Sequence, residues 1–190
     1  MKQAIDTDPY LLPADLPAPV DDGACRHLRA MKVPSISLRS TSGRDVNLAS
    51  ASSGQVVFFF YPETGKPGTQ IPKSWNDIPG ARGCTPQSCS FRGRHSEFRE
   101  LGFEVFGVSA QSLDEQKEFA ERNKLPYDLL NDSDFRLTNE LRLPTFKFES
   151  KTFIKRLALV VRRGRIKRVF YPVFPPDKNA EIVLEYLRGK

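Results

Sequence analysis

Two cysteines that lie five residues apart, Cys84 and Cys89, are the side chains in this sequence with the clearest capacity for chemistry. A cysteine attacks other atoms as its thiolate, but a free thiol, with a pKa of about 8.5, is mostly protonated at neutral pH. A helix is expected to begin here, because Thr85 suits the N-cap and Pro86 suits the first helical position. The unpaired N–H groups and the dipole at a helix start stabilise an anion. We therefore expect Cys84 to act as a nucleophilic thiolate.

The spacing of the two cysteines limits how they can form a disulfide. An intact helix rises about 1.5 Å per residue and holds the Cα atoms of Cys84 and Cys89 about 7.5 Å or more apart. A disulfide needs a Cα separation below about 7 Å. The sequence therefore predicts that the first turns of the helix unwind before these sulfurs bond. Arg82 and Arg92 are expected to add positive charge nearby, whereas Cys25 has no such context and is expected to be unreactive.

A buried strand is expected to fix the position at which this helix begins. The run from Gln55 to Tyr61 is continuously apolar apart from its first residue and stops at Pro62, which is typical of a strand covered on both faces in an α/β sheet. The carboxyl edge of such a sheet is where α/β folds place their sites. The Gly- and Pro-rich segment 63–83 that follows is long for a connection, so we expect it to serve the site.

The remaining elements alternate between strands and helices and predict a layered α/β sandwich. Residues 1–30 are interpreted as a loose, Pro-rich N-terminal extension, and residues 31–190 as one domain. Turns at Ser42-Gly43 and Arg163-Gly164, alternation of apolar residues and a capping box at Ser112–Glu115 set the other expected bounds. These are strands 35–38, 46–48, 105–109 and 127–130, helices 85–101, 112–124, 133–141 and 180–187, and hairpins over 145–153 and 154–174.

Four features together resemble the peroxiredoxins of the alkyl hydroperoxide reductase/thiol-specific antioxidant family, most closely the Q-type or bacterioferritin comigratory protein group. They are Phe60-Tyr61-Pro62 at the end of a strand, Gly83-Cys84-Thr85 at a helix start, Cys89, and Arg92. The resemblance implies a thioredoxin-like three-layer sandwich with a central mixed sheet. It also implies a peroxidase for hydrogen peroxide and organic hydroperoxides, with Cys84 as the peroxidatic residue and Cys89 as the resolving residue.

Further site residues follow from the same resemblance. Arg156 matches an arginine that opens a late strand and holds the peroxide and the thiolate, and Gln87 matches a residue that orients it. The family needs no metal or organic cofactor. Its disulfide is returned to the dithiol by a thioredoxin-type protein, and the Q-type group implies a monomer.

The sequence departs from the family pattern before the nucleophile. The family has a proline seven residues and a threonine or serine three residues before the cysteine, whereas Asp77 and Ala81 stand here. An insertion within segment 63–83 accounts for this difference. We therefore expect Thr64 to supply the hydroxyl that otherwise lies three residues before Cys84.

Composition and charge narrow the alternatives. The net charge is +6, and eight basic residues lie between Lys151 and Arg168, but no nucleic-acid-binding motif accompanies them, so they are interpreted as the solvated faces of a hairpin. No apolar run has the length of a membrane span, and no secretion signal is recognised, so a cytoplasmic location is expected.

Two other functions stay open at this stage. One is a non-catalytic thioredoxin-fold binding module. The other is a disulfide reductase, because Leu143-Pro144-Thr145 resembles the cis-proline element of thioredoxins. Such reductases have two residues between their cysteines, whereas four separate Cys84 from Cys89, so the spacing favours the peroxidase.

Overall fold

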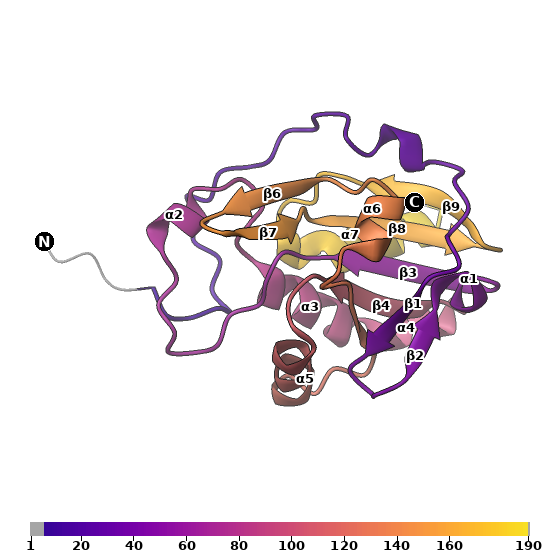
Figure 1. Cartoon of the computed structure of the whole chain (residues 1–190), viewed down its shortest axis with the longest axis horizontal. Coiled ribbons are helices and arrows are strands. Elements are labelled where there is room, and N and C mark those ends of the chain that lie inside the picture. The colour runs from indigo at the N-terminus through magenta and orange to yellow at the C-terminus, as the bar shows by residue number, and fades with distance from the viewer. Residues whose placement is uncertain (1–5, 190) are drawn as a thin grey trace, which may run out of the picture.

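A seven-stranded mixed sheet forms the centre of the computed structural model, which describes residues 6–189 (Figure 1). Its strand order is β2-β1-β5-β4-β3-β8-β9. The strands are β1 (Ser37–Ser40), β2 (Asp45–Asn47), β3 (Gln55–Phe60), β4 (Glu104–Ser109), β5 (Leu129–Asn131), β8 (Leu157–Arg162) and β9 (Arg165–Phe170). The parallel strands β3, β4 and β5 lie in the middle, and β1 and β8 pair antiparallel on either side.

The central strand is β3, as its apolar run predicts. Its register aligns Phe58 with Phe106 of β4 on one side and with Leu159 of β8 on the other. Every residue of β3 after Gln55 is buried, because helices cover one face of the sheet and short elements cover the other. Because β3 is buried, the position of its carboxyl end is fixed in the sheet. From this end the chain continues through the inserted segment to Cys84.

Two apolar cores lie on opposite faces of the sheet and make the molecule three-layered. One face carries α3 (Cys84–Gly93), α4 (His95–Glu100), α5 (Leu113–Arg122) and α7 (Asn179–Leu187). The Phe91 ring of α3 stacks on the Phe59 ring of β3 with centroids 4.3 Å apart. The other face carries the short elements η1 (Arg26–Leu28), α1 (Leu48–Ala51) and α6 (Arg136–Glu140).

A separate hairpin packs against the inserted segment. Strands β6 (Thr145–Phe148) and β7 (Lys151–Ile154) form a two-stranded sheet, and α2 (Lys73–Asn76) lies beside the end of this hairpin in Figure 1. The Trp75 ring of α2 contacts three rings of the hairpin, with centroid distances of 5.0 to 5.8 Å; these rings belong to Phe146, Phe148 and Phe153. The insertion is therefore a packed part of the fold.

The N-terminal extension also differs from the expected loose arm. From Asp6 onward it is hydrogen-bonded to the domain, and it runs along the upper edge of Figure 1 to η1 before the chain enters β1. Leu28 of η1 is fully buried and joins the core. Residues 1–5 lie outside the described part. Within residues 6–189, no helix is long and apolar enough to cross a membrane.

The start of α3 corrects one sequence expectation. The N-cap is Gly83 rather than Thr85, so Cys84 is the first helical residue and Pro86 the third. The backbone of Gly83 is left-handed, with φ of 105°, a conformation that glycine adopts at little cost. The helix also ends at Gly93 instead of Leu101, and α4 follows after a break at Arg94. Glycine is a poor helix former, which favours a break there.

Other element bounds agree with the expectations to within a few residues. The capping box is present, because the Ser112 hydroxyl accepts from the Glu115 N–H and the Glu115 carboxylate accepts from the Ser112 N–H. The short 3-10 helix η2 (Pro176–Lys178) was not expected and leads into α7. The Leu143–Pro144 bond is trans, so the expected likeness of this segment to a cis-proline element is wrong.

Candidate active site

Cys84 is the first residue of α3, and neighbouring side chains pack closely around this helix start. A Cβ atom added to Gly83 would lie 2.9 Å from Leu12 Cδ2 and would overlap Pro176, so only glycine fits before the cysteine. Cys84 itself is buried, and its sulfur lies 3.6 Å from the Ala81 carbonyl oxygen. The fold thus fixes the thiol at the N-terminus of α3, where the helix favours an anion.

Arg156, just before β8, brings a positive charge to this sulfur. Its Nη2 lies 3.3 Å from Cys84 Sγ and donates to the carbonyl oxygens of Gly80, Ala81 and Arg82 at 3.1 to 3.2 Å. Its Nη1 donates to Gln87 Oε1. The structure therefore brings together Cys84, Gln87 and Arg156, three of the residues expected at the site.

The guanidinium of Arg156 lacks a carboxylate partner. The residue is 3% exposed, and no ion pair joins it to an acidic side chain within residues 6–189. A buried charge without a counterion is costly, and neutral carbonyl oxygens offset only part of that cost. Among the groups that touch the guanidinium, Cys84 is the one that can become an anion. The arrangement therefore places a positive charge where it stabilises any negative charge that develops near the Cys84 sulfur during a reaction.

Asn179 completes this chain of contacts and was missed by sequence reasoning. The Gln87 Nε2 donates to Asn179 Oδ1 at 2.9 Å, and both side chains are buried. A glutamine amide can turn either its oxygen or its nitrogen towards a neighbour. Because Asn179 accepts from the nitrogen, the Gln87 oxygen faces Arg156. An asparagine at a helix start is common for capping reasons alone, so the sequence carried no specific signal.

We expect Asn179→Ala to slow the reaction of Cys84 with peroxide by about five- to tenfold, the effect of losing one buried hydrogen bond. The amide of Gln87 would then no longer be fixed with its oxygen towards Arg156. Asn179→Asp keeps an acceptor for the Gln87 nitrogen and should restore most of the rate. Stopped-flow kinetics of peroxide oxidation measures both variants. Equal rates in Asn179→Ala and the wild type would show that Asn179 does not orient Gln87.

Thr64 lies on the wall of the same cavity as Cys84, but its hydroxyl bonds elsewhere. It donates to Gln111 Oε1 at 2.9 Å, and the Gln111 Nε2 donates back to the Thr64 carbonyl at 3.1 Å. Within the described residues, no hydrogen bond joins Thr64 to Cys84 or Arg156. Gln111 was not expected near the site. The role of Thr64 as a hydroxyl donor stays a prediction.

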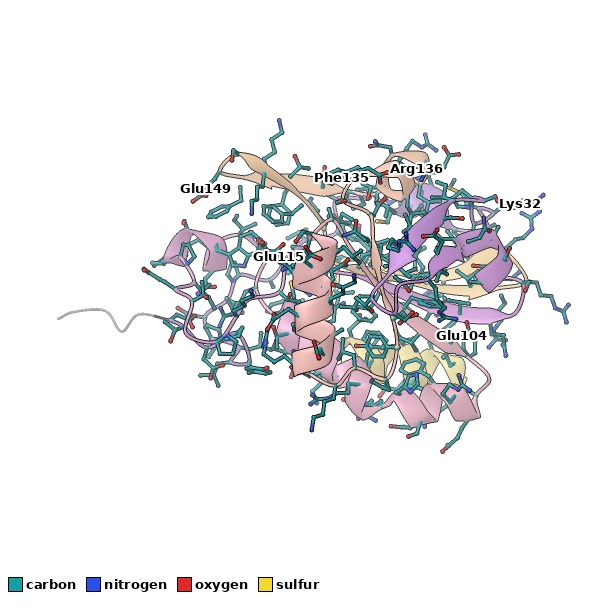
Figure 2. All side chains as sticks on the ribbon, turned by 60° about the horizontal axis from the view of Figure 1, so that its bottom comes forward. Lys32, Glu104, Glu115, Phe135, Arg136 and Glu149 are labelled. Carbon is teal, nitrogen blue, oxygen red and sulfur yellow. The ribbon has the colours of Figure 1, made fainter. Side chains whose placement is uncertain are left out.

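A cavity of about 350 Å³ opens beside Cys84. The inserted segment and the β6–β7 hairpin build one apolar wall, which includes Ile71, Trp75 and Phe153. Figure 2 labels two acidic residues that also line it, Glu115 near the start of α5 and Glu149 at the hairpin turn. The segment expected to serve the site therefore does form part of its wall. No cluster of His, Cys, Asp and Glu within residues 6–189 is arranged to hold a metal ion.

Cys89 lies one and a half turns further along α3, and all three cysteines are free thiols. Its sulfur lies 3.8 Å from Asn123 Oδ1. Burial raises the pKa of the Cys89 thiol, although the nearby Arg92 and Arg122 act in the opposite direction. The positive charge of Arg92 therefore acts on the Cys89 thiol, where it favours a lower pKa. The Arg92 Nη1 donates to the Asn123 carbonyl at 2.8 Å.

Two other expectations concern residues outside this cluster. The Arg82 side chain donates to the carbonyl oxygens of Asp8 and Leu11, so its guanidinium is engaged by the extension. Cys25 is buried on the other face of the sheet, in the core next to η1. Burial, together with the charges of Asp22 and Asp21, raises the pKa of Cys25 to about 12. A thiol with such a pKa is a poor nucleophile at neutral pH.

Comparisons with known proteins agree with this architecture. The sequence matches the Redoxin family over residues 29–184. It is 31% identical over 157 residues to "Peroxiredoxin Q, chloroplastic" of Sedum lineare, a match that covers 82% of this chain and 75% of that protein. It is 28% identical over 156 residues to the protein of the same name in Suaeda salsa, covering 82% of this chain and 65% of that relative. The match thus spans slightly less than two thirds of the Suaeda protein.

The similarity extends to the three-dimensional structure of a solved protein. The crystal structure of peroxidoxin BcpB from Mycobacterium tuberculosis superposes with a TM-score of 0.69 at 26% identity, covering 85% of this chain and 96% of that one. The thioredoxin-like α/β fold expected from the sequence is thereby confirmed.

Proposed function

The chain belongs to the Redoxin family and, within it, to the Q-type peroxiredoxins, and from this membership we propose that it is a thiol-dependent peroxidase that uses Cys84 as its nucleophile. The observation that carries the proposal is the contact of the buried, carboxylate-free guanidinium of Arg156 with the Cys84 sulfur at 3.3 Å. A thiolate at this position is both the counterion of Arg156 and a reactive nucleophile.

The first chemical step oxidises Cys84. Its thiolate attacks the terminal oxygen of a hydroperoxide, the S–O bond forms and the O–O bond breaks. The sulfur becomes a sulfenic acid, and the other oxygen leaves as water or an alcohol after it takes up a proton. Arg156 and the N–H groups at the start of α3 stabilise the negative charge that moves from sulfur to the leaving oxygen. Gln87 holds the guanidinium in place.

The second step joins the two cysteines. The Cys89 sulfur attacks the Cys84 sulfenic sulfur, the S–S bond forms and water leaves. An external thiol donor then reduces the disulfide, and we propose a thioredoxin-type protein for this role. The enzyme acts on hydrogen peroxide and organic hydroperoxides, as the Q-type relationship suggests, and as a monomer.

Three further expectations from the sequence belong to this proposal. Thr64 contributes a hydroxyl to the bound peroxide after it exchanges its bond to Gln111. The chain consists of an extension, residues 1–30, and a peroxiredoxin domain, residues 31–190. The protein acts in the cytoplasm, whereas the names of the plant relatives carry the word chloroplastic.

A disulfide-mapping experiment tests the proposal. The reduced chain treated with one equivalent of hydrogen peroxide should yield one disulfide, between Cys84 and Cys89, with Cys25 left as a thiol because it is buried and has a raised pKa. Mass spectrometry of the digested, alkylated protein identifies the linked peptides. The Cys25→Ser chain serves as the control and should give the same product. Peroxide that stays unconsumed, or a disulfide that contains Cys25, would contradict the assignment.

A further inference from the structure

The N-terminal extension lies directly across the start of α3, and its first anchor is Arg82. This side chain is 5% exposed and donates to the Asp8 carbonyl at 2.6 Å and the Leu11 carbonyl at 3.0 Å. It also pairs with the Asp6 carboxylate at 3.3 Å. Arg82 stands two residues before Cys84, so the extension is tied to the chain immediately before the nucleophile.

A second anchor joins the extension to the surroundings of Cys89. The Tyr10 hydroxyl donates to Asn123 Oδ1 at 2.9 Å, and this is the same oxygen that lies 3.8 Å from the Cys89 sulfur. Arg122 Nη1 donates to the Tyr10 hydroxyl at 2.9 Å. One tyrosine of the extension thus shares its acceptor with the proposed resolving thiol.

A third set of contacts ties the extension to the inserted segment. The N–H groups of Gly68 and Ile71 donate to the carbonyl oxygens of Thr7 and Asp6 at 3.0 and 2.8 Å. Pro9 is buried and lines the cavity that contains Cys84. Residues 6–12 therefore bond directly to Arg82, are linked to Cys89 through Asn123, and form part of the wall of the cavity.

These contacts oppose the motion that disulfide formation needs. With α3 intact, Cys89 lies five positions after Cys84 on one helix, which holds their Cα atoms about 7.5 Å or more apart. The first turns of α3 must unwind, but Arg82 and the Asn123 contact hold this stretch at its two ends. Unwinding therefore requires these bonds to break.

The extension is attached in a way that permits release. Between Asp6 and Val20, Pro9 is the one buried residue, and Tyr10 is 41% exposed. The segment is held mainly by hydrogen bonds and one ion pair, with little burial of apolar surface. Segments held in this way open more easily than the core of a domain.

We propose that residues 6–12 act as a strap that keeps the start of α3 folded and so sets the rate at which Cys89 resolves the Cys84 sulfenic acid, with Tyr10 and Arg82 as its positioning residues. The proposal rests on the proposed function. While the strap is closed, the sulfenic acid persists, and a second hydroperoxide can oxidise it to the sulfinic acid with release of water or an alcohol. Release of the strap lets the Cys89 sulfur reach the sulfenic sulfur, and water leaves.

Stopped-flow fluorescence of Trp75, the single tryptophan, separates the two steps, because this residue lines the cavity beside Cys84. Oxidation of Cys84 depends on peroxide concentration, whereas resolution is a first-order phase that does not. Tyr10→Phe removes one hydroxyl from the strap and should speed resolution about threefold, the effect expected for one hydrogen bond. A chain lacking residues 1–11 loses several such bonds and should resolve about tenfold faster or more.

Tyr186→Phe is the matched control, since Tyr186 is a similarly exposed tyrosine on α7, and its ring packs edge-to-face with Phe170 with centroids 5.8 Å apart. Its resolution rate should equal that of the wild type. Mass spectrometry of the same chains should find less sulfinic acid on Cys84 in Tyr10→Phe and in the truncated chain at a given excess of peroxide.

The outcomes distinguish this inference from the proposed function. Resolution at the wild-type rate, or slower, in both Tyr10→Phe and the truncated chain would overturn the strap while the peroxide-dependent phase still supported the enzyme. Absence of a peroxide-dependent phase in the wild-type chain would overturn the proposed function itself. If the truncated chain does not fold, Tyr10→Phe and its control decide the question alone.

Discussion

Replacement of Cys84 by serine is expected to reduce peroxide consumption to the background rate, because a serine hydroxyl is not ionised at neutral pH even beside Arg156. The side chain keeps its size and its place at the start of α3, so the loss would reflect chemistry and not misfolding. Consumption of hydrogen peroxide with dithiothreitol as the reductant measures the effect, and circular dichroism verifies the fold.

The matched variant is Cys89→Ser, which keeps the nucleophile and removes the proposed resolving thiol. It should consume about one equivalent of peroxide per chain at the wild-type rate and then turn over poorly with a thioredoxin-type reductant. Cys25→Ser should behave like the wild type, because Cys25 lies on the opposite face of the sheet from the Cys84 core. Peroxide reduction by the Cys84→Ser chain at a rate near that of the wild type would contradict the account.

Replacement of Arg156 by alanine should lower the second-order rate constant for peroxide oxidation of Cys84 by about 10²- to 10³-fold, the range found when a preorganised donor to a developing charge is lost. The guanidinium is the cationic group that contacts the sulfur, and its removal leaves the thiolate without a counterion. Arg156→Lys keeps a charge but cannot make all of the bonds to Gln87, the backbone and the sulfur, so it should restore the rate only in part.

Arg162→Ala, at the opposite end of β8 from Arg156, is the control. Arg162 ends β8, is exposed and lies over the Phe103 ring at 5.2 Å, well away from the cavity. Its loss should leave the rate constant within about twofold of the wild type. Similar rate constants for Arg156→Ala and Arg162→Ala would show that the Arg156 contact does not activate Cys84.

The local patterns of the sequence predicted most of the sheet. The apolar run of β3 identified its central strand, and the turn at Arg163-Gly164 identified the β8–β9 hairpin. The capping box at Ser112 placed the start of α5. In each case the determining interactions join residues that are close in the sequence, so a local pattern carries the information.

The start of α3 was harder to predict, because the residue that caps it is fixed by distant contacts. Thr85 and Pro86 suit a helix start by composition, but the tight approach of Leu12 and Pro176 requires glycine at position 83. The Thr85 hydroxyl is left buried without a hydrogen-bond partner among the described residues. The nucleophile consequently lies inside the first turn and not before it.

The cluster of Cys84, Gln87 and Arg156 was expected from the family resemblance, whereas its supporting residues were not. Asn179 lies 92 positions after Gln87, and Gln111 lies 47 positions after Thr64. Asparagine and glutamine are common on protein surfaces, so neither residue type marks a site. Contacts across such distances follow from tertiary packing, and so does the attachment of the extension to Arg82.

The most direct test of the central claim is the rate at which the Cys89→Ser chain forms a sulfenic acid on residue 84. The reduced chain is mixed with hydrogen peroxide in the presence of dimedone, and the adduct is located and timed by mass spectrometry. The account predicts an adduct on Cys84 alone, formed at least about a thousand times faster than on free cysteine. A reaction no faster than that of free cysteine, or an adduct on Cys25 instead, would contradict it.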